Sequence, residues 1–331
     1  MKHVSSPSES ERPALLGTTA STTPLPSNAR RSETRSILPV WTVGVLLFAI
    51  VFQSHAQDAA KFTRVEDIIY GRKHGVALTL DMLRPAEPNG LGVIFIVSGG
   101  WYSAKRAINP QFLGGFVERG YTVFAVLHGS QPKFQIAEID KDIHRAVRFI
   151  RHNAGKFGVD PDRLGVSGAS AGGHLSLLLA TRGDEGVKDA KDPVDRESSA
   201  VQAVACFFPP TDFLNYGKPG EDAVGVGTLA DYNAAFGPMI RTAQGRQLLG
   251  RAISPINFVS EKTPPILIVH GDADVLVPIQ QAESFLKKCE EKKVPTMLIR
   301  REGKGHGWPG MDKEMEVLAG WFDQHLKARK K

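Results

Sequence analysis

A serine that could act as a nucleophile stands at the centre of a G-x-S-x-G pattern, Gly168-Ala169-Ser170-Ala171-Gly172. The chain contains 33 glycines, so the pattern alone can arise by chance. It becomes informative between the apolar run Arg163–Ser167 and the Leu- and Ala-rich stretch Gly173–Arg182, because a strand-to-helix turn exposes the serine. The small residues at 168 and 172 suit such a crowded turn. The alternative is a turn that only packs a helix against a sheet.

A serine hydroxyl is a poor nucleophile at neutral pH, so the hypothesis requires a base and an acid that orients it. Both follow in the order found in doubly wound hydrolases, acid first and histidine second. Asp272 and Asp274 come directly after the apolar run Ile266–His270, and His306 lies between two glycines after a further apolar run. A histidine on a glycine-rich loop is more typical of a site than of a core. At this point both aspartates are candidates for the acid.

A pair of glycines could supply the oxyanion site that a serine nucleophile attacking a carbonyl group needs. Gly99 and Gly100 follow the apolar run Leu91–Val97, and loops at the carboxyl ends of parallel strands hold the ligand site in such sheets. The amides of these glycines, together with the amide of Ala171 at a helix start, would stabilise a tetrahedral oxyanion. The alternative is a flexible turn without chemistry.

Four residues on or beside these loops are candidate substrate contacts: Trp101, Tyr102, Asp212 and Trp308. Trp101 and Tyr102 would either stack on a substrate at the rim or anchor the loop by packing. Asp212, in the segment Pro209–Phe213, would line the pocket or cap an Asx turn.

The elements that must position these residues alternate along the chain. A hairpin is expected from Thr63–Tyr70 and Val76–Leu83, because two alternating segments flank a glycine-containing turn. Beyond it, runs that are apolar on both faces are separated by helices, which predicts a mostly parallel eight-stranded sheet with helices on both faces. The expected parallel strands are Leu91–Val97, Tyr121–Leu127, Arg163–Ser167, Val201–Phe208, Ile266–His270 and Pro295–Arg300. The expected helices are Asn109–Arg119, Ile136–Gly158, Gly173–Arg182, Ile279–Lys293 and Lys313–Leu326.

Two further regions stand outside this alternation. Residues 213–260 lack clean periodicity and are rich in Gly and Ala, so a small lid-like insertion is expected there. The two cysteines, Cys206 in an apolar strand and Cys289 on a charged helix, are expected to be free thiols.

The amino-terminal part differs in composition from the rest. Residues 1–36 are rich in Ser, Thr, Pro and Arg and are expected to be disordered. Residues 37–52 are uncharged and almost wholly apolar, and Ser54 and Ala56 are the small residues that a signal peptidase needs. Residues 37–56 are therefore interpreted as an export signal cleaved after Ala56, with a membrane anchor as the alternative. The catalytic domain would span 61–331.

Composition excludes several other classes of protein. The chain has 331 residues, 42% hydrophobic and 23% charged, with a formal net charge of +6, which is ordinary for one large globular α/β domain. No dense basic stripe interleaved with aromatic residues occurs, so a nucleic-acid partner is not expected. No close His, Cys and Glu cluster has ligand spacing, so neither a metal nor another cofactor is expected. A membrane partner is expected only if the amino-terminal segment stays attached.

The chain resembles a family of bacterial α/β-hydrolases grouped with feruloyl and acetyl xylan esterases and neighbouring the hormone-sensitive-lipase-like esterases. The resemblance covers about Thr63 to Leu326. Its segments are SGGWY, DIHRAVRFIRHNAGKFGVDPDRLGVSGASAGGHLSLLLA, FFPPTDF, SPINFVSEKTPPILIVHGDADVLVP and GKGHGW.

The resemblance implies an α/β-hydrolase fold with Ser170 as nucleophile, Asp274 as the acid and His306 as general base. It also implies a carboxylic ester as substrate, either a small molecule or a carbohydrate-linked ester such as an acetyl or feruloyl ester of plant polysaccharide. The chain departs from the family at Val97-Ser98-Gly99-Gly100, where relatives usually have His-Gly-Gly-Gly. The loop histidine that braces this segment in relatives is missing, which leaves the acyl preference open.

Two other functions remain open. A serine peptidase of the prolyl-oligopeptidase type shares this catalytic domain but usually adds a large propeller, for which residues 1–60 leave no room. A hydrolase-fold binding protein without activity is the second alternative, and the complete set of catalytic residue types argues against it.

Overall fold

The structure of the chain is a computed structural model that describes residues 62–327. The expectations of disorder at 1–36 and of a signal or anchor at 37–56 lie outside the described residues. Within the described part, no helix has both the length and the apolar character needed to cross a membrane.

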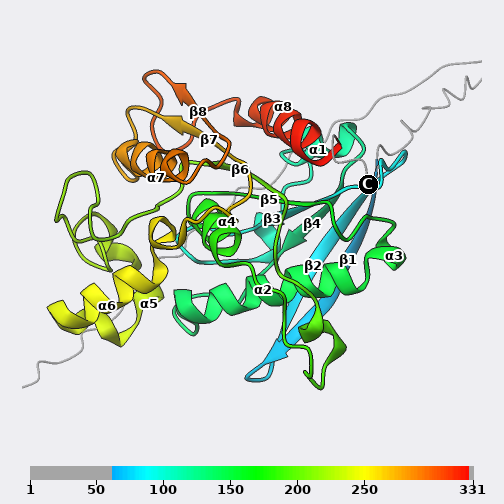
Figure 1. Ribbon diagram of the computed structural model, residues 1–331, viewed down its shortest axis with the longest axis horizontal. Coiled ribbons are helices and arrows are strands. Elements are labelled where there is room, and N and C mark those ends of the chain that lie inside the picture. The colour runs from blue at the N-terminus through cyan, green and yellow to red at the C-terminus, as the bar shows by residue number, and fades with distance from the viewer. Residues whose placement is uncertain (1–61, 328–331) are drawn as a thin grey trace, which may run out of the picture. The chain divides into compact units, whose positions relative to one another are not determined.

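The core of the fold is a single eight-stranded sheet in the order β1-β2-β4-β3-β5-β6-β7-β8 (Figure 1). Strands β1 and β2 form the expected hairpin, β2 pairs antiparallel with β4, and the other pairs are parallel. The mostly parallel eight-stranded sheet is therefore confirmed. The strands are β1 (Phe62–Lys73), β2 (Val76–Pro85), β3 (Gly92–Ile96), β4 (Thr122–Val126), β5 (Leu164–Ala169), β6 (Ala203–Phe207), β7 (Ile266–Gly271) and β8 (Thr296–Arg301).

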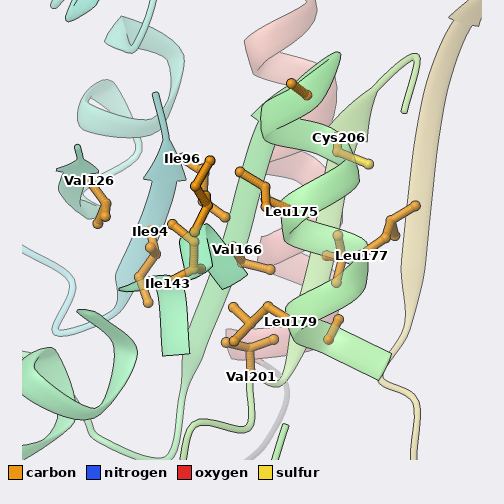
Figure 2. Close-up of a cluster of buried hydrophobic side chains, with 14 of the residues drawn as sticks. Ile94, Ile96, Val126, Ile143, Val166, Leu175, Leu177, Leu179, Val201 and Cys206 are labelled. Carbon is orange, nitrogen blue, oxygen red and sulfur yellow. The ribbon is translucent and has the colours of Figure 1, made fainter. Parts of the chain in front are cut away.

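Alternate residues of each parallel strand enter two separate cores, because successive side chains of a strand point to opposite faces. On β3, Ile94 and Ile96 belong to one core, whereas Val93 and Phe95 belong to the other. Figure 2 shows part of the first core, in which Ile96 lies beside Leu175 and Ile94 lies beside Ile143. Helices α2 (Ile136–His152), α4 (Ala171–Arg182) and α7 (Gln280–Glu291) contribute to this core, and α1 (Gly114–Glu118) and α8 (Met311–Phe322) cover the other face. Burial on both faces explains why these strands read as continuous apolar runs.

Two helices are shorter than the sequence predicts. The helix expected at 109–119 is α-helical only over α1, because the Asn109 side chain accepts the amides of Gln111 and Phe112 and stabilises a turn there. The helix expected at 136–158 ends at His152 and resumes as α3 (Ala154–Phe157). Asn153 stands at the break, where its side chain donates to the Phe149 carbonyl and competes with the helical backbone.

Residues 213–260, where the sequence predicts a small lid-like insertion, form a largely helical segment between β6 and β7. It contains α5 (Asn233–Phe236), α6 (Ala243–Ile253) and short 3-10 helices at Gly227–Tyr232, Pro238–Arg241 and Pro255–Phe258. Its aromatic residues Phe213, Tyr216 and Phe236 are fully buried, so it packs firmly on the rest of the fold. Cys206 on β6 and Cys289 on α7 are both buried free thiols.

The strand order reverses where β3 lies between β4 and β5. Ligand sites of open α/β sheets lie at such a reversal, beyond the carboxyl ends of the strands. The loops after β3 and β5, which carry Gly99 and Ser170, are therefore neighbours.

Candidate active site

Ser170 lies on the expected sharp turn between β5 and α4. It has φ +54°, a conformation that side-chain-bearing residues rarely adopt, so the turn is strained as the sequence predicted. The flanking glycines are required by close backbone contact. A Cβ on Gly168 would lie 2.5 Å from the Gly172 carbonyl carbon, and a Cβ on Gly172 would lie 2.5 Å from the Ile96 carbonyl oxygen.

His306 connects the serine to an aspartate. Its Nε2 lies 2.8 Å from Ser170 Oγ and its Nδ1 lies 2.7 Å from Asp274 Oδ2. The three side chains come from the loops after β5, β7 and β8, which all leave the same edge of the sheet. Because a carboxylate only accepts, Nδ1 carries the proton and Nε2 is left to accept from the serine hydroxyl.

Asp274 is almost completely buried but remains a good acceptor. Burial by itself would raise the pKa of this carboxyl, but hydrogen bonds from neighbouring imidazoles and from the Val277 amide outweigh it and hold the pKa well below its usual range. Its Oδ1 accepts the amides of Leu276 and Val277, both at 2.9 Å. The carboxylate is therefore ionised and fixed in orientation at neutral pH.

The other candidate acid has a different place. Asp272 is exposed, and its Oδ1 accepts the Gly303 amide at 2.7 Å. It joins the loops after β7 and β8 and thereby helps to place the segment that leads to His306. Asp274 is the aspartate that contacts the histidine.

An aromatic residue beside the histidine was not singled out from the sequence. The ring of Phe208 is buried, and its centroid lies 4.5 Å from that of the His306 ring. The centroids of the Phe208 and Trp308 rings are 6.0 Å apart. Trp308 is half-buried and packs against Phe207 and Phe208. These contacts anchor the loop that carries His306. The positive φ of Phe208, +31°, marks it in the structure, but its apolar run gave no sequence signal beyond a buried strand.

The segment Ser98–Tyr102, here called the oxyanion loop, is a tight hairpin turn. The Gly99 amide donates to the Tyr102 carbonyl at 3.0 Å, and the Tyr102 amide donates to the Gly99 carbonyl at 2.9 Å. The prediction that the Gly99 amide stabilises an oxyanion is therefore wrong for this conformation, because that donor is already used. The amides of Gly100 and Ala171 have no hydrogen-bond acceptor among the described residues, so they are the available donors.

Trp101 is not a substrate contact, and the packing alternative is the correct one. Its side chain is buried, and its indole Nε1 donates to Nδ1 of His174 at 3.1 Å. The ring also packs edge-on against Phe236 of the insertion. His174 Nε2 lies 2.8 Å from the Ile253 carbonyl, so this imidazole joins the oxyanion loop, α4 and α6. Burial lowers the pKa of His174 to about 4, and the imidazole is neutral.

The two remaining candidates differ. The Tyr102 ring is 46% exposed, with the Arg106 guanidinium 5.9 Å from its centroid, so it is free to meet a ligand. Asp212 takes the capping alternative. Its carboxylate accepts the Leu214 amide and the side-chain amide of Asn215, which makes it an Asx turn within the insertion. Asp212 lines a surface cavity together with Leu214 and Asn215, but none of the triad residues lines that cavity, so the prediction of Asp212 as a substrate contact is not supported.

A second serine–histidine pair exists but cannot meet a substrate. His144 Nδ1 lies 2.8 Å from Ser199 Oγ, yet Ser199 is fully buried and its hydroxyl also accepts the Asp184 amide. Within residues 62–327, no group of three or more His, Cys, Asp and Glu side chains is arranged to hold a metal ion.

The eight-stranded sheet and the Ser–His–Asp constellation at its carboxyl edge define an α/β-hydrolase. The BD-FAE family model matches residues 80–289, which is more than half of the chain. The chain therefore belongs to the BD-FAE family.

Named relatives agree with this class. The probable carboxylic ester hydrolase LipM of Mycobacterium tuberculosis is 28% identical over 76% of this chain and 56% of its own length. The esterase LipC of the same organism is 28% identical over 74% of this chain and 60% of its own length. The chain thus spans less than two thirds of the length of these relatives. Among solved structures, an acetyl ester-xyloside bifunctional hydrolase from Caldicellulosiruptor lactoaceticus has a TM-score of 0.65 and 24% identity, covering 78% of this chain and 95% of its own.

Proposed function

We propose that the protein is a serine hydrolase that cleaves carboxylic esters through an acyl-enzyme intermediate. The observation that carries the proposal is the position of His306, with one ring nitrogen 2.8 Å from Ser170 Oγ and the other 2.7 Å from Asp274 Oδ2. Such a chain of hydrogen bonds activates a hydroxyl that is otherwise unreactive. The named esterase relatives support the same reaction class.

In the acylation half, His306 Nε2 takes the proton of the Ser170 hydroxyl while Oγ attacks the ester carbonyl carbon. The carbonyl π electrons move to the oxygen, and the oxyanion accepts hydrogen bonds from the amides of Gly100 and Ala171. The bond to the alkoxy oxygen then breaks, and the departing alcohol receives the proton from Nε2. Asp274 stabilises the imidazolium that exists between the two transfers.

In the deacylation half, a water molecule gives a proton to His306 Nε2 and its oxygen attacks the acyl carbon. The tetrahedral intermediate uses the same two amides. When it collapses, Ser170 Oγ leaves and regains its proton from Nε2, which releases the carboxylic acid. The enzyme returns to its starting protonation state without a cofactor.

For the substrate we propose an acetyl or feruloyl ester of plant polysaccharide. The exposed Tyr102 ring on the oxyanion loop offers an aromatic face on which a sugar or phenolic ring could stack. The insertion at 213–260 packs on the loop, since the Tyr232 ring lies against Gly100 and Trp101, and would shape access for the acyl group. A panel of acetyl, feruloyl and longer acyl esters, measured on the purified protein, tests this choice.

Replacement of Ser170 by Ala tests the reaction itself. We expect the variant to lose turnover of a short-chain nitrophenyl ester and labelling by a fluorophosphonate probe, with an unchanged circular dichroism spectrum. Ser199→Ala is the matched control, because it removes the hydroxyl of the buried serine–histidine pair and should retain both properties. Undiminished turnover in Ser170→Ala would refute the assignment.

The two alternatives give different results in the same experiments. A peptidase of the prolyl-oligopeptidase type would cleave proline-containing peptides faster than acetylated xylan. A binding protein without activity would leave Ser170 unlabelled by the probe. Labelling at Ser170 together with ester turnover and no peptide cleavage supports the esterase.

We further propose that the protein is exported, with cleavage after Ala56. The support is in the sequence: residues 37–52 are apolar and uncharged, and Ser54 and Ala56 are small. Amino-terminal sequencing of protein recovered from the producing cells should start at residue 57. An intact amino terminus in the membrane fraction would instead favour the anchor.

A further inference from the structure

We propose that Gln131 is a positioning residue that holds the oxyanion loop in its catalytic conformation. The inference rests on the proposed esterase function. Gln131 is on the loop after β4 and touches none of the triad side chains in the described structure, so it would act only through the backbone of residues 100 and 101.

Gln131 contacts two consecutive carbonyls of the oxyanion loop. Its side-chain Nε2 donates to the Gly100 carbonyl at 2.9 Å, and its backbone amide donates to the Trp101 carbonyl at 3.2 Å. A carbonyl oxygen can only accept, which fixes the orientation of the glutamine amide group. The side chain is half-buried, so water competes only partly for these bonds.

The turn that Gln131 contacts has two alternative forms. Gly99 and Tyr102 pair as the ends of a hairpin turn with two central residues. These are Gly100, with φ +54°, and Trp101, with φ +59°. Positive φ at both central residues is the mark of a type I′ turn. A type II′ turn has the same flanking hydrogen bonds but the opposite orientation of the central peptide, and it needs glycine only at the first central position.

The sequence of the turn favours the form that is not observed. Gly100 occupies the first central position, which suits type II′, whereas positive φ at a bulky residue such as Trp101 is strained. The observed form therefore needs an external contact that the other form lacks. The central peptide carries the Gly100 carbonyl, and its flip would break the hydrogen bond from the Gln131 side chain.

The flip matters for catalysis because the central peptide adjoins the Gly100 amide. Reversing it turns one amide dipole through about half a revolution beside the expected oxyanion, which changes the stabilisation of the transition state. Gln131 would thus supply a constraint on the loop in a chain that lacks the usual loop histidine. The hydrogen bond from its side chain to the Gly100 carbonyl favours the observed turn form over type II′.

The loop that presents Gln131 is itself fastened to the oxyanion loop. The Ser103 amide donates to Ser130 Oγ at 2.7 Å, and that hydroxyl donates back to the Ser103 carbonyl at 2.8 Å. On its other side, the Gly129 amide donates to the buried carboxylate of Asp142, which also pairs with Lys73. These hydrogen bonds fix the backbone just before Gln131 relative to the turn.

The test uses Gln131→Leu, which keeps the side-chain size and removes the donor. We expect kcat to fall by about tenfold or more, which is less than the roughly 10²–10³-fold loss for a missing oxyanion donor because the Gly100 amide itself remains, with KM changed less than about threefold. Affinity for a trifluoromethyl ketone, which forms a tetrahedral adduct, should fall by the same factor as kcat/KM. The inference would be overturned if Gln131→Leu had the same kcat as the wild type. It would also be overturned if the variant lost kcat but bound the ketone with unchanged affinity.

Gln202→Leu is the matched control. The Gln202 side chain accepts the Leu164 amide at 2.8 Å, at the amino end of β5 and away from the site. Its loss also removes one hydrogen bond between a glutamine side chain and the backbone, although Gln202 is the acceptor, and should lower the melting temperature without changing the affinity for the ketone. A purely structural role of Gln131 would give this same result.

Gln131→Glu adds a pH readout. The introduced carboxylate cannot donate to the Gly100 carbonyl, but its protonated form can. The ratio of variant to wild-type kcat/KM should therefore rise as the pH falls, since the titration of His306 is common to both enzymes. A ratio that is independent of pH would contradict the proposed donor role.

A crystal structure of Gln131→Leu separates this inference from the proposed function. We expect the peptide between Gly100 and Trp101 to flip and the φ of Trp101 to become negative, whether or not the protein hydrolyses esters. An unchanged turn would refute the role of Gln131. Whether the esterase proposal itself fails is decided independently, by the ester turnover of the wild-type protein and of Ser170→Ala.

Discussion

Replacing Asp274 by Asn should almost abolish activity while leaving the fold intact, and the structure gives the reason. Asp274 Oδ1 accepts the amides of Leu276 and Val277, each at 2.9 Å. An asparagine must keep its oxygen at this place, because its NH2 group would otherwise face two N–H donors, at about 1–3 kcal/mol for each unsatisfied group. The NH2 group therefore takes the place of Oδ2 and faces His306.

This arrangement forces the wrong tautomer on the histidine. Nδ1 of His306 must accept from the asparagine, so Nε2 carries the proton and donates to Ser170 instead of accepting from it. In serine proteases the same change lowers kcat about 10⁴-fold. That factor corresponds to about 5.5 kcal/mol of transition-state stabilisation.

The assay is steady-state hydrolysis of a nitrophenyl acetate by Asp274→Asn, with thermal unfolding to verify the fold. Asp272→Asn is the matched control, since the asparagine oxygen can still accept the Gly303 amide and activity should stay within about threefold of wild type. Activity of Asp274→Asn within tenfold of wild type would refute the tautomer reasoning. A larger loss in Asp272→Asn than in Asp274→Asn would transfer the acid role to Asp272.

Two other predictions concern packing and pH. Gly172→Ala should cost about 1–3 kcal/mol of unfolding free energy, since its Cβ would lie 2.5 Å from the Ile96 carbonyl oxygen, whereas Gly155→Ala has no atom within 4 Å and should be neutral or stabilising in urea titrations. Burial lowers the pKa of His128 and of His174 to about 4, below the ordinary 6.5 of an unfolded chain. The unfolded state therefore binds more protons between these values, and stability should be complete above about pH 6.5 and decline toward pH 4, on the order of 3 kcal/mol for each histidine. Unfolding midpoints that stay constant from pH 7 to pH 4 would contradict the burial argument.

Much of the fold could be predicted because strand burial leaves a strong local signal. Runs such as Ile266–Gly271 are apolar on both faces, and this pattern survives in the sequence without knowledge of the neighbours. The ends of helices were predicted less well. Asn109 and Asn153 interrupt helical patterns through side-chain hydrogen bonds to the backbone, and a periodicity argument does not contain these bonds.

The candidate site shows the same division. Ser170 was predictable because the glycines at 168 and 172 record a local steric demand. The choice between Asp272 and Asp274 could not be made from local sequence, because both lie on the loop after β7 and only the position of His306 distinguishes them. Resemblance to a family selected Asp274, and the distances agree with it.

The sequence by itself determined the order of strands and helices, the elbow that carries Ser170, and the residue types of a nucleophile, acid and base. These depend on short-range sterics and on hydrophobic periodicity, which neighbours in the chain encode. Only the tertiary structure decided that the Gly99 amide is already bonded to Tyr102, that Trp101 packs on His174, and that Gln131 reaches the Gly100 carbonyl. Each of these contacts joins residues through backbone groups or across distant loops. A backbone amide or carbonyl looks alike at every position of a sequence, so its partner becomes known only when the chain is folded.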